Sequence, residues 1–314
     1  MNQNINSIDI EEKRKIFLEG LEKTYKKFEK FDKFPGTGFK NRLIRLFFYP
    51  NYYFNRFIKG KLSKNKTVIL FWGKKINLNT KETSFLSVNG ILSGLAEYKL
   101  TKFFIKNFKE NDIFYDIGAN FGFYSFLALE FCKEVHLFEP IPFIFDNLKD
   151  NFKDYQNVFL NNIALSDKKG KIDLFIPEGS SIDSMSGSSI IQETTQVHSY
   201  QFKKKIEVET ETLENYFKSH NLPSVIKLDV EGAESLVIEG GLEFFKNNSP
   251  IISLEVWSPK EGGEISMKAV QKLKDIGYQS YQINKNGELE KVDGNLSIIV
   301  EKESLSGDNF IFKK

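Results

Sequence analysis

The stretch FYDIGANFGFYS, residues 114–125, contains the first residues whose types and spacing could do chemistry. A short apolar run stops at Asp116, and Gly118, Asn120 and Gly122 then follow at every second position. Glycines at a strand-to-helix turn allow a tight turn and a close approach of the backbone, and the helix N-terminus offers free amide groups. In a doubly wound sheet, an adenine-bearing cofactor lies at such a turn. We therefore expect this turn to bind a cofactor.

The glycine spacing separates two classes of cofactor. The dinucleotide fingerprint G-x-G-x-x-G seats a pyrophosphate, but the residues two, four and five positions after Gly118 are Asn120, Gly122 and Phe123, so the third glycine is absent. Asp116 precedes the turn, where a carboxylate repels phosphates and can hold an ammonium group. The turn therefore favours a cofactor with a cationic end and no phosphate, and S-adenosylmethionine fits that description.

A second carboxylate supports an adenosyl site. The next predicted strand ends at Glu139, 23 residues after Asp116. A carboxylate at that strand end can accept hydrogen bonds from both hydroxyls of an adenosine ribose. A lone Glu in this position is more often a solvated cap, so it is the pair at this spacing that predicts the site.

The strand in SVIKLDVEGAE, residues 224–234, carries unusual charge. Lys227, Asp229 and Glu231 fall on one face, because strand side chains alternate. A central parallel strand is normally an unbroken apolar run, and buried charges are costly unless paired. One interpretation is a structural Lys227–Asp229 ion pair. The other, which we favour, places Asp229 at the cofactor crevice as a base, a substrate anchor or a metal ligand, with Lys227, Glu231 and the strand-end Glu255 as candidate substrate-binding residues.

Further candidates come from loops and histidines. His198 is the rival base, whereas His136 lies inside a predicted strand and His220 ends a predicted helix, so both are expected to be structural. Ser188 lies in the Ser-rich loop over residues 179–190, whose hydroxyls could bind a polyol, or which could be a lid or a plain connection. Asp229, Glu231 and Glu255 would suit magnesium, but no metal-ligand spacing requires a metal, and none is predicted.

The elements that must position these residues alternate between strands and helices. This pattern predicts a parallel sheet with helices on both faces. Strands are expected over residues 112–118, 134–140, 157–165, 171–177, 224–232, 251–257 and 308–314, and helices over 124–132, 142–152, 212–220, 233–247 and 265–277. Before them, the sequence predicts an amphipathic helix over 9–31 and a short strand over 67–72.

Charge is distributed unevenly along the chain. Residues 33–81 contain twelve Lys or Arg and no Asp or Glu, whereas the remaining residues contain 32 basic and 42 acidic side chains. The basic, aromatic segment 39–66 could touch an anionic membrane surface, hold an acidic glycan or lipid-phosphate-linked saccharide, or pack against the acidic remainder or a second subunit, and we favour packing or self-association. Without a recognised binding module, nucleic acid is not an expected partner.

Compartment and redox class follow from two observations. Cys132 is the single cysteine of 314 residues, which excludes an internal disulfide. The polar, acidic N-terminus does not resemble a secretory signal, and no apolar run approaches the roughly 18 residues of a spanning helix. We expect a cytoplasmic protein, and membrane contact through the segment 39–66 would place it at the inner membrane surface.

Five motifs together resemble one known family. The stretches YDIGANFGFYS, LFEP, NNIALSDKKG, IKLDVEGAE and LEVW occur in the order seen in FkbM-type methyltransferases, and the resemblance runs from about Leu95 to Phe312. It implies a Rossmann-like class I methyltransferase fold with a mainly parallel, seven-stranded sheet and S-adenosylmethionine as donor. Residues 1–80 do not match and are predicted to form an N-terminal helical and basic extension to a methyltransferase domain over 81–314.

The resemblance also implies roles for individual residues. By position, Asp116, Gly118, Asn120 and Gly122 would line the methionine end of the cofactor and Glu139 its ribose. Glu97, in GLAEYKL, matches an acidic position near the cofactor.

We therefore expect an O-methyltransferase acting on a hydroxyl of a saccharide, such as a surface polysaccharide or glycan precursor. Three alternatives remain open at this stage. They are methylation of a non-sugar secondary metabolite, an NAD-dependent oxidoreductase on a similar fold, which the glycine spacing disfavours, and a binding protein that keeps the fold without catalysis.

Overall fold

The structure is a computed structural model that describes residues 9–27, 29, 66–78, 86, 89–177 and 202–314. The chain divides into two compact units, Met1–Asn107 and Phe108–Lys314. The predicted extension over 1–80 and methyltransferase domain over 81–314 stay predictions. Within the described residues, no helix is both long and apolar enough to cross a membrane.

The first unit is built on two helices and a hairpin. Its described elements are α1 (Ile10–Lys26), β1 (Lys66–Ile69), β2 (Lys75–Leu78) and α6 (Leu95–Asn107). Asp9 caps α1 by accepting a hydrogen bond from the Glu11 amide. Phe17 of α1 stacks on Trp72 with ring centroids 5.6 Å apart, and Tyr25 stacks on Tyr98 of α6. The predicted N-terminal helix is thus present, and α6 packs on it within the same unit.

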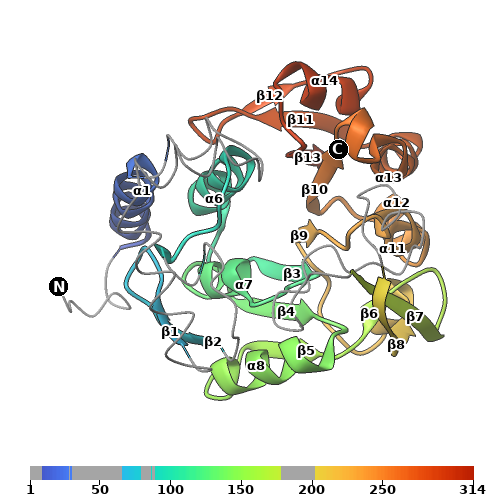
Figure 1. Ribbon diagram of the computed structural model, residues 1–314, viewed down its shortest axis with the longest axis horizontal. Coiled ribbons are helices and arrows are strands. Elements are labelled where there is room, and N and C mark those ends of the chain that lie inside the picture. Colours follow the sequence, from blue (N-terminus) through green and yellow to red (C-terminus); the bar gives the residue numbers. More distant parts are fainter. Residues whose placement is uncertain (1–8, 28, 30–65, 79–85, 87–88, 178–201) are drawn as a thin grey trace. The chain divides into compact units, whose positions relative to one another are not determined.

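The second unit contains a large mixed sheet (Figure 1). Within the described residues it has eight strands, in the order β12 (Leu289–Lys291), β11 (Gln279–Ile283), β13 (Gly307–Lys313), β10 (Ile251–Trp257), β9 (Val225–Leu228), β3 (Ile113–Ile117), β4 (Glu134–Phe138) and β5 (Val158–Asn161). Strands β10, β9, β3, β4 and β5 are parallel, and β13 is antiparallel to both of its neighbours. The predicted Rossmann-like, mainly parallel sheet is confirmed. The expected count of seven is not confirmed, because β11 and β12 were not predicted and the strand predicted over 171–177 lies in a separate sheet.

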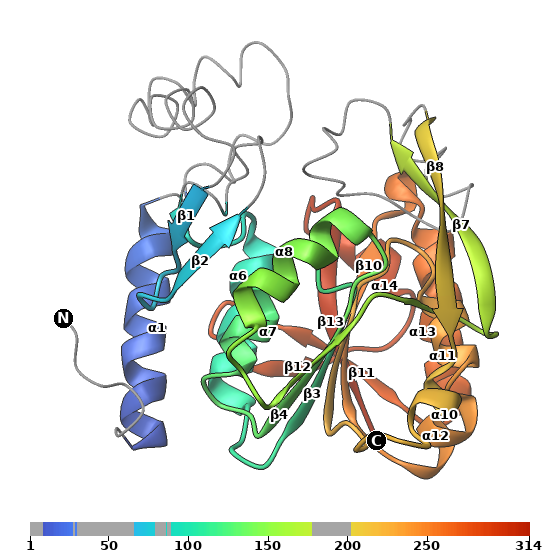
Figure 2. The same cartoon turned by 90° about the horizontal axis from the view of Figure 1, so that it is seen from below.

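Helices cover both faces of this sheet (Figure 2). One face carries α7 (Phe123–Ala128) and α8 (Pro142–Phe152), and the other carries α10 (Leu213–Tyr216), α11 (Glu234–Glu239), α12 (Leu242–Asn247) and α13 (Gly263–Asp275). A 3-10 turn, η2 (Pro259–Glu261), precedes α13, and α14 (Leu296–Lys302) packs against α13 and β10. Tyr115 and Ile117 point into the apolar core on the α10–α13 face. Asp116 therefore points to the α7 face, because side chains alternate along β3.

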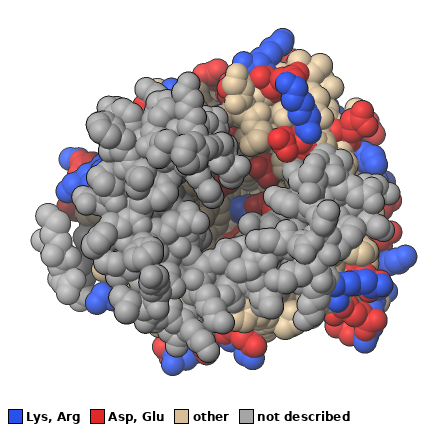
Figure 3. Space-filling model, viewed as in Figure 1, with Lys and Arg blue, Asp and Glu red and all other residues tan. Residues whose placement is uncertain are grey.

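A separate three-stranded sheet has the order β6 (Ala164–Leu165), β8 (Phe202–Glu211) and β7 (Gly170–Pro177). The strand predicted over 157–165 is in fact two strands, because β5 joins the main sheet and β6 joins this small one. Lys171 pairs with Glu207, and Lys205 pairs with Asp173 across the β7–β8 ladder. Basic and acidic atoms accordingly lie side by side over this hairpin (Figure 3).

Three predicted features fall outside the described residues. Ser188 and His198 both lie there, as does the segment 39–66 except for Lys66, whose backbone begins β1. These predictions stay predictions.

The sheet order places the site. The chain runs outward from β3 to β4 and β5, and then crosses to form β9 and β10 on the other side of β3. The order therefore reverses between β3 and β9. In open α/β sheets, ligands bind outside the carboxyl ends of the strands at such a switch point.

Candidate active site at the carboxyl edge of the sheet

The glycines of the turn make room for the protein itself. Gly118 has a φ of +82°, and a Cβ there would lie 1.8 Å from the backbone oxygen of Asp229. Gly122 has a φ of +78°, and a Cβ there would lie 2.9 Å from side-chain atoms of Leu148 and Phe152 on α8. Residue types other than glycine rarely adopt such angles. The turn thus needs glycine to pack against the end of β9 and against α8, and the expected close approach to a cofactor stays a prediction.

Asp116 is a buried carboxylate with one oxygen satisfied. It is 1% exposed, and its Oδ2 accepts a hydrogen bond of 2.6 Å from the Ser125 hydroxyl on α7. Its Oδ1 is buried and has no hydrogen-bond partner among the residues that the structure describes. Burial raises the pKa of Asp116, and the nearby Lys227 ammonium and the Ser125 hydrogen bond oppose that rise. A buried acceptor without a partner is costly, so Oδ1 is available for a ligand donor.

Asn120 and Glu139 are linked across the turn. Asn120 has a φ of +51°, and its amide donates to Glu139 Oε2 over 2.9 Å. Glu139 Oε1 accepts from the Ile141 amide over 2.9 Å. Burial raises the pKa of Glu139 to about 7, although both amide bonds oppose the rise. Glu139 therefore holds the turn in place, and each carboxylate oxygen keeps a second lone pair for a further donor. The buried Asn120 Oδ1 has no partner within the described residues.

Lys227 and Asp229 form an ion pair at the end of β9. The Lys227 ammonium donates to Asp229 Oδ2 over 2.8 Å, and their side chains are 6% and 32% exposed. The same ammonium lies 5.4 Å from the centre of the Tyr124 ring. Lys227 is opposite Asp116 in the register of β9 and β3, on the same face of the sheet. Both interpretations of this strand thus have support, since the pair exists and Asp229 is also accessible.

Glu255 lies beyond Asp229 along the same edge. Leu254 pairs with Leu228, so Glu255 and Asp229 each follow the last residues that pair β10 with β9. Glu255 Oε2 accepts from the Trp257 indole over 3.1 Å, and its other oxygen lies against Gly307. Half-buried Glu231 has a φ of +53° in the turn after Asp229. The register therefore brings Glu139, Asp229 and Glu255 to one edge of the sheet.

Comparison with a family model identifies the protein family in which this edge of the sheet occurs. The model of the methyltransferase FkbM domain matches residues 116–280, more than half of the chain. The chain belongs to the FkbM methyltransferase family. The match begins at Asp116 and includes the glycine turn, Glu139, the Lys227–Asp229 pair and Glu255. The predicted resemblance is confirmed.

Individual proteins are similar to this FkbM-family chain to different extents. It is 33% identical over 174 residues to the 2-O-methyltransferase NoeI of Sinorhizobium fredii (strain NBRC 101917 / NGR234), which is 52% of this chain and 66% of that relative. Among solved structures, the methyltransferase FkbM from Methylobacillus flagellatus KT is 11% identical, covers 66% of this chain and 44% of its own, and has a TM-score of 0.42. TYW2 of M. jannaschii in complex with AdoMet is 12% identical, with coverage of 80% and 87% and a TM-score of 0.37.

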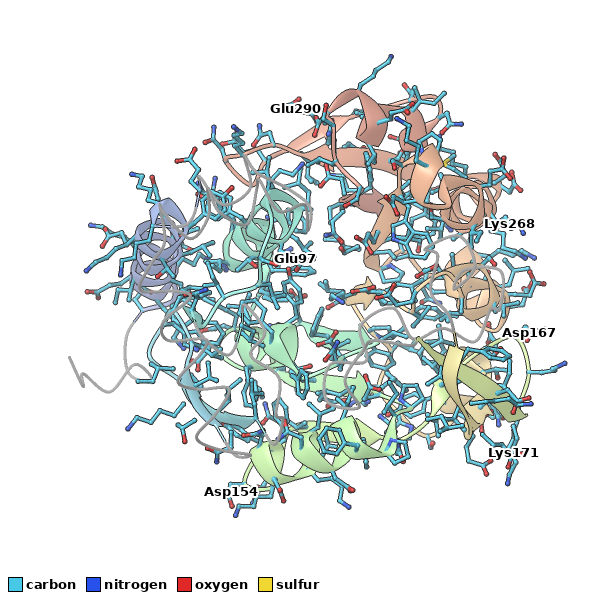
Figure 4. The ribbon with its side chains drawn as sticks, viewed as in Figure 1. Glu97, Asp154, Asp167, Lys171, Lys268 and Glu290 are labelled. Carbon is cyan, nitrogen blue, oxygen red and sulfur yellow. The ribbon has the colours of Figure 1, made fainter. Side chains whose placement is uncertain are left out.

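Two other predicted residues of this FkbM-family chain belong to different elements. Glu97 is near the start of α6 in the first unit, and its predicted place near the cofactor stays a prediction (Figure 4). His136 is fully buried in β4, bonded to the Tyr216 hydroxyl over 2.8 Å and to Glu134 over 2.6 Å. Asn161 also donates to the Tyr216 hydroxyl. We call Glu134, His136, Asn161 and Tyr216 the histidine network, which is structural, as predicted for His136.

Sequence reasoning missed Glu234. This residue is 2% exposed, and its Oε1 accepts from the amides of Val230 and Gly232 in the turn after Asp229. Its Oε2 is buried without a partner in the described part of the chain, and burial raises its pKa to about 7. The signal was available, because an acidic residue in the first turn of a helix commonly accepts backbone amides. No group of three or more metal-ligating side chains occurs within the residues described.

Proposed function

We propose that this chain is an S-adenosylmethionine-dependent O-methyltransferase whose acceptor is a hydroxyl of a saccharide. Family membership supports methyl transfer, and the relative NoeI carries the name of a 2-O-methyltransferase. The observation that carries the proposal is the buried Asp116, with an oxygen lacking a partner among the described residues, at the switch point of the sheet. Such a carboxylate suits a ligand with a cationic donor.

The donor set fits this cofactor. The two buried atoms without described partners at the turn, Asp116 Oδ1 and Asn120 Oδ1, are both acceptors. S-adenosylmethionine presents an ammonium group and ribose hydroxyls, which are donors. Asp116 and Asn120 would hold its methionine end, and Glu139 would accept from the ribose through its remaining lone pairs. A pyrophosphate needs donors instead, so the same atoms disfavour a dinucleotide and an oxidoreductase.

Asp229 is suited to the proton transfer. When bound, the cofactor supplies a methyl group on a sulfonium sulfur, so the protein must orient the acceptor hydroxyl and receive its proton. Lys227 holds Oδ2 of Asp229, and the side chain is 32% exposed. Asp229 would therefore accept the hydroxyl hydrogen bond and take the proton as the oxygen–carbon bond forms and the carbon–sulfur bond breaks, which would leave the cofactor as a neutral thioether. His198 remains the alternative base.

The acceptor class follows from the acidic edge. Asp229, Glu231 and Glu255 present carboxylates, which accept hydrogen bonds from hydroxyl groups. A polyol has many such donors, so a saccharide of a surface polysaccharide or a glycan precursor is our proposed acceptor, with Ser188 as a further contact. A hydroxylated secondary metabolite is the alternative acceptor, and methyl transfer to it would retain the enzyme class while refuting the saccharide.

Calorimetric titration with S-adenosylhomocysteine tests the cofactor. We expect micromolar binding, about −8 kcal/mol, and no comparable binding of NADH. Asp116→Asn should lose that binding, whereas Asp173→Asn should retain it, because Asp173 is an exposed partner of Lys205 in the small sheet. No binding to the wild-type protein would refute the proposal.

Transfer of a labelled methyl group then tests the acceptor. The wild-type protein is incubated with labelled S-adenosylmethionine and a panel of neutral, amino and acidic oligosaccharides, beside a panel of phenolic and aliphatic alcohols. Label that appears only in alcohols would refute the saccharide assignment.

We also propose that the protein is cytoplasmic, that residues 1–80 form an extension to a methyltransferase domain, and that segment 39–66 mediates self-association. This segment is basic and the rest of the chain is acidic, which supports an electrostatic contact between them. Sedimentation at low and high salt tests it, because such a contact weakens with ionic strength. A monomer at low salt that floats with anionic vesicles would favour membrane contact instead.

A further inference from the structure

Lys227 is enclosed by the residues of the proposed site. Its side chain is 6% exposed, its ammonium is bonded to Asp229 and it lies over the Tyr124 ring. Asp116 is its register partner on β3. The ammonium is thus held inside the protein, which argues against the substrate contact expected for Lys227 from the sequence.

The surroundings of Lys227 explain why a cation is retained there. Three carboxylates lie around the end of β3 and β9, namely Asp116, Glu139 and Asp229, and the first two are at most 4% exposed. A buried carboxylate tends to take up a proton unless a cation or hydrogen bonds stabilise its charge. An ammonium over an aromatic ring is itself stabilised by the ring. The Lys227 ammonium therefore lies beside two carboxylates that the proposed site needs in ionised form, Asp116 for the cofactor and Asp229 for the acceptor.

We propose that Lys227 is a positioning residue that serves both halves of the site, keeping Asp116 ionised for the cationic end of the cofactor and holding one oxygen of Asp229 so that the other faces the acceptor. This inference rests on the proposed function. In this role, the side chain of Lys227 links the cofactor-binding half of the site to the acceptor-binding half.

The charges that face Asp116 support this role. Lys227 and Asp229 face it from β9 and the following turn, Ser125 from α7, and Glu139 from the end of β4. Burial raises the pKa of Asp116. The Lys227 ammonium and the hydrogen bonds from Ser125 lower this pKa, and the Asp229 carboxylate raises it further. Lys227 also opposes the rise in the pKa of Glu139. Removal of the ammonium should therefore protonate Asp116 over a wider pH range.

The test is the pH dependence of S-adenosylhomocysteine binding, measured by calorimetry. In Lys227→Met, affinity near neutral pH should fall about tenfold or more, and it should recover as the pH rises, because each unit of pKa shift changes proton affinity tenfold. Lys227→Arg keeps the charge and should keep the midpoint of the pH profile. Lys205→Met is the matched control, since Lys205 pairs with Asp173 over 2.7 Å but is 58% exposed.

A second variant keeps the inference falsifiable where Lys227→Met does not fold. Lys227→Gln removes the charge but keeps a hydrogen-bond donor for Asp229, so its binding midpoint should also move to higher pH. A midpoint that is unchanged in folded Lys227→Met or Lys227→Gln protein would overturn the role of Lys227 and leave the proposed function standing. Failure of the wild-type protein to bind S-adenosylhomocysteine would refute both.

Discussion

Two groups of buried polar side chains lie in the same sheet and differ in how completely they are bonded. In the histidine network, both ring nitrogens of His136 have partners, and the Tyr216 hydroxyl is shared with Asn161. At the carboxyl edge, Asp116 has an oxygen without a described partner, and Asp229 is a third exposed. Burial alone therefore does not mark a site. Incomplete bonding of a buried carboxylate at the switch point is what we expect of a group that binds a ligand.

The largest effect is expected for Asp229→Asn, which removes the proposed proton acceptor. Methyl transfer should slow by about 100- to 10,000-fold, because positioned general bases contribute that much. The variant should still bind S-adenosylhomocysteine, at the pH where binding to the variant is strongest. A rate close to that of the wild-type protein, measured with labelled donor, would make Asp229 a structural residue like those of the histidine network.

Asp116→Asn should separate cofactor binding from stability. The affinity for S-adenosylhomocysteine should fall about 100-fold or more, equivalent to about 2.7 kcal/mol, because the charged acceptor is lost. The free energy of unfolding should change by less than about 1 kcal/mol, since the amide still accepts from Ser125 and no longer buries a charge. Calorimetry and urea denaturation measure the two quantities. If the free energies of binding and of unfolding fell by equal amounts, Asp116 would not differ from the residues of the histidine network.

His136→Ala is the converse test. The free energy of unfolding should fall by about 2 kcal/mol, because the change leaves a cavity and removes a partner from both Glu134 and Tyr216. The affinity for S-adenosylhomocysteine should stay within about twofold. A loss of affinity at unchanged stability would show that the network belongs to the site.

Glu234 is intermediate, because one of its oxygens is bonded and the other is not. Its pKa of about 7 in the folded protein lies above the ordinary 4.5, so folding favours the protonated form. Its contribution to stability is complete below pH 4.5 and is lost as the pH rises to about 7 and beyond. Glu234→Gln keeps an acceptor for the amides and should flatten this decline by about 3 kcal/mol, measured by urea denaturation across that window. Glu243→Gln, at an exposed side chain, should leave the slope unchanged.

The main elements were predictable because each has a local signal. The apolar runs before Asp116 and Glu139 and the helical spacing after them predicted β3, α7, β4 and α8 at nearly their observed bounds. The split of residues 157–165 between two sheets was not predictable, since periodicity describes a strand and not its partner. Strands β8, β11 and β12 were missed, and the three residues of β12 form too short a pattern to recognise.

The candidate site was predictable in its residue types and not in its contacts. Alternation correctly placed Lys227 and Asp229 on one face, and the switch point follows from the order of elements. The need for glycine at positions 118 and 122 comes from close contacts with Asp229 and Leu148, which are distant from the turn in sequence. Likewise, the buried position of Lys227 requires knowledge of Tyr124 and Asp116 around it. Such facts arise from tertiary packing, which no local pattern encodes.

The contact between Gly118 and the backbone of Asp229 has a consequence for recombining this domain with its relatives. A Cβ at position 118 would lie 1.8 Å from the Asp229 oxygen, so the turn must keep glycine there as long as the end of β9 keeps its present path. A chimera that exchanges only the turn, or only the end of β9, would inherit a mismatched pair. Residues 116–122 and 227–234 therefore form one exchangeable module, although more than a hundred residues of chain separate them.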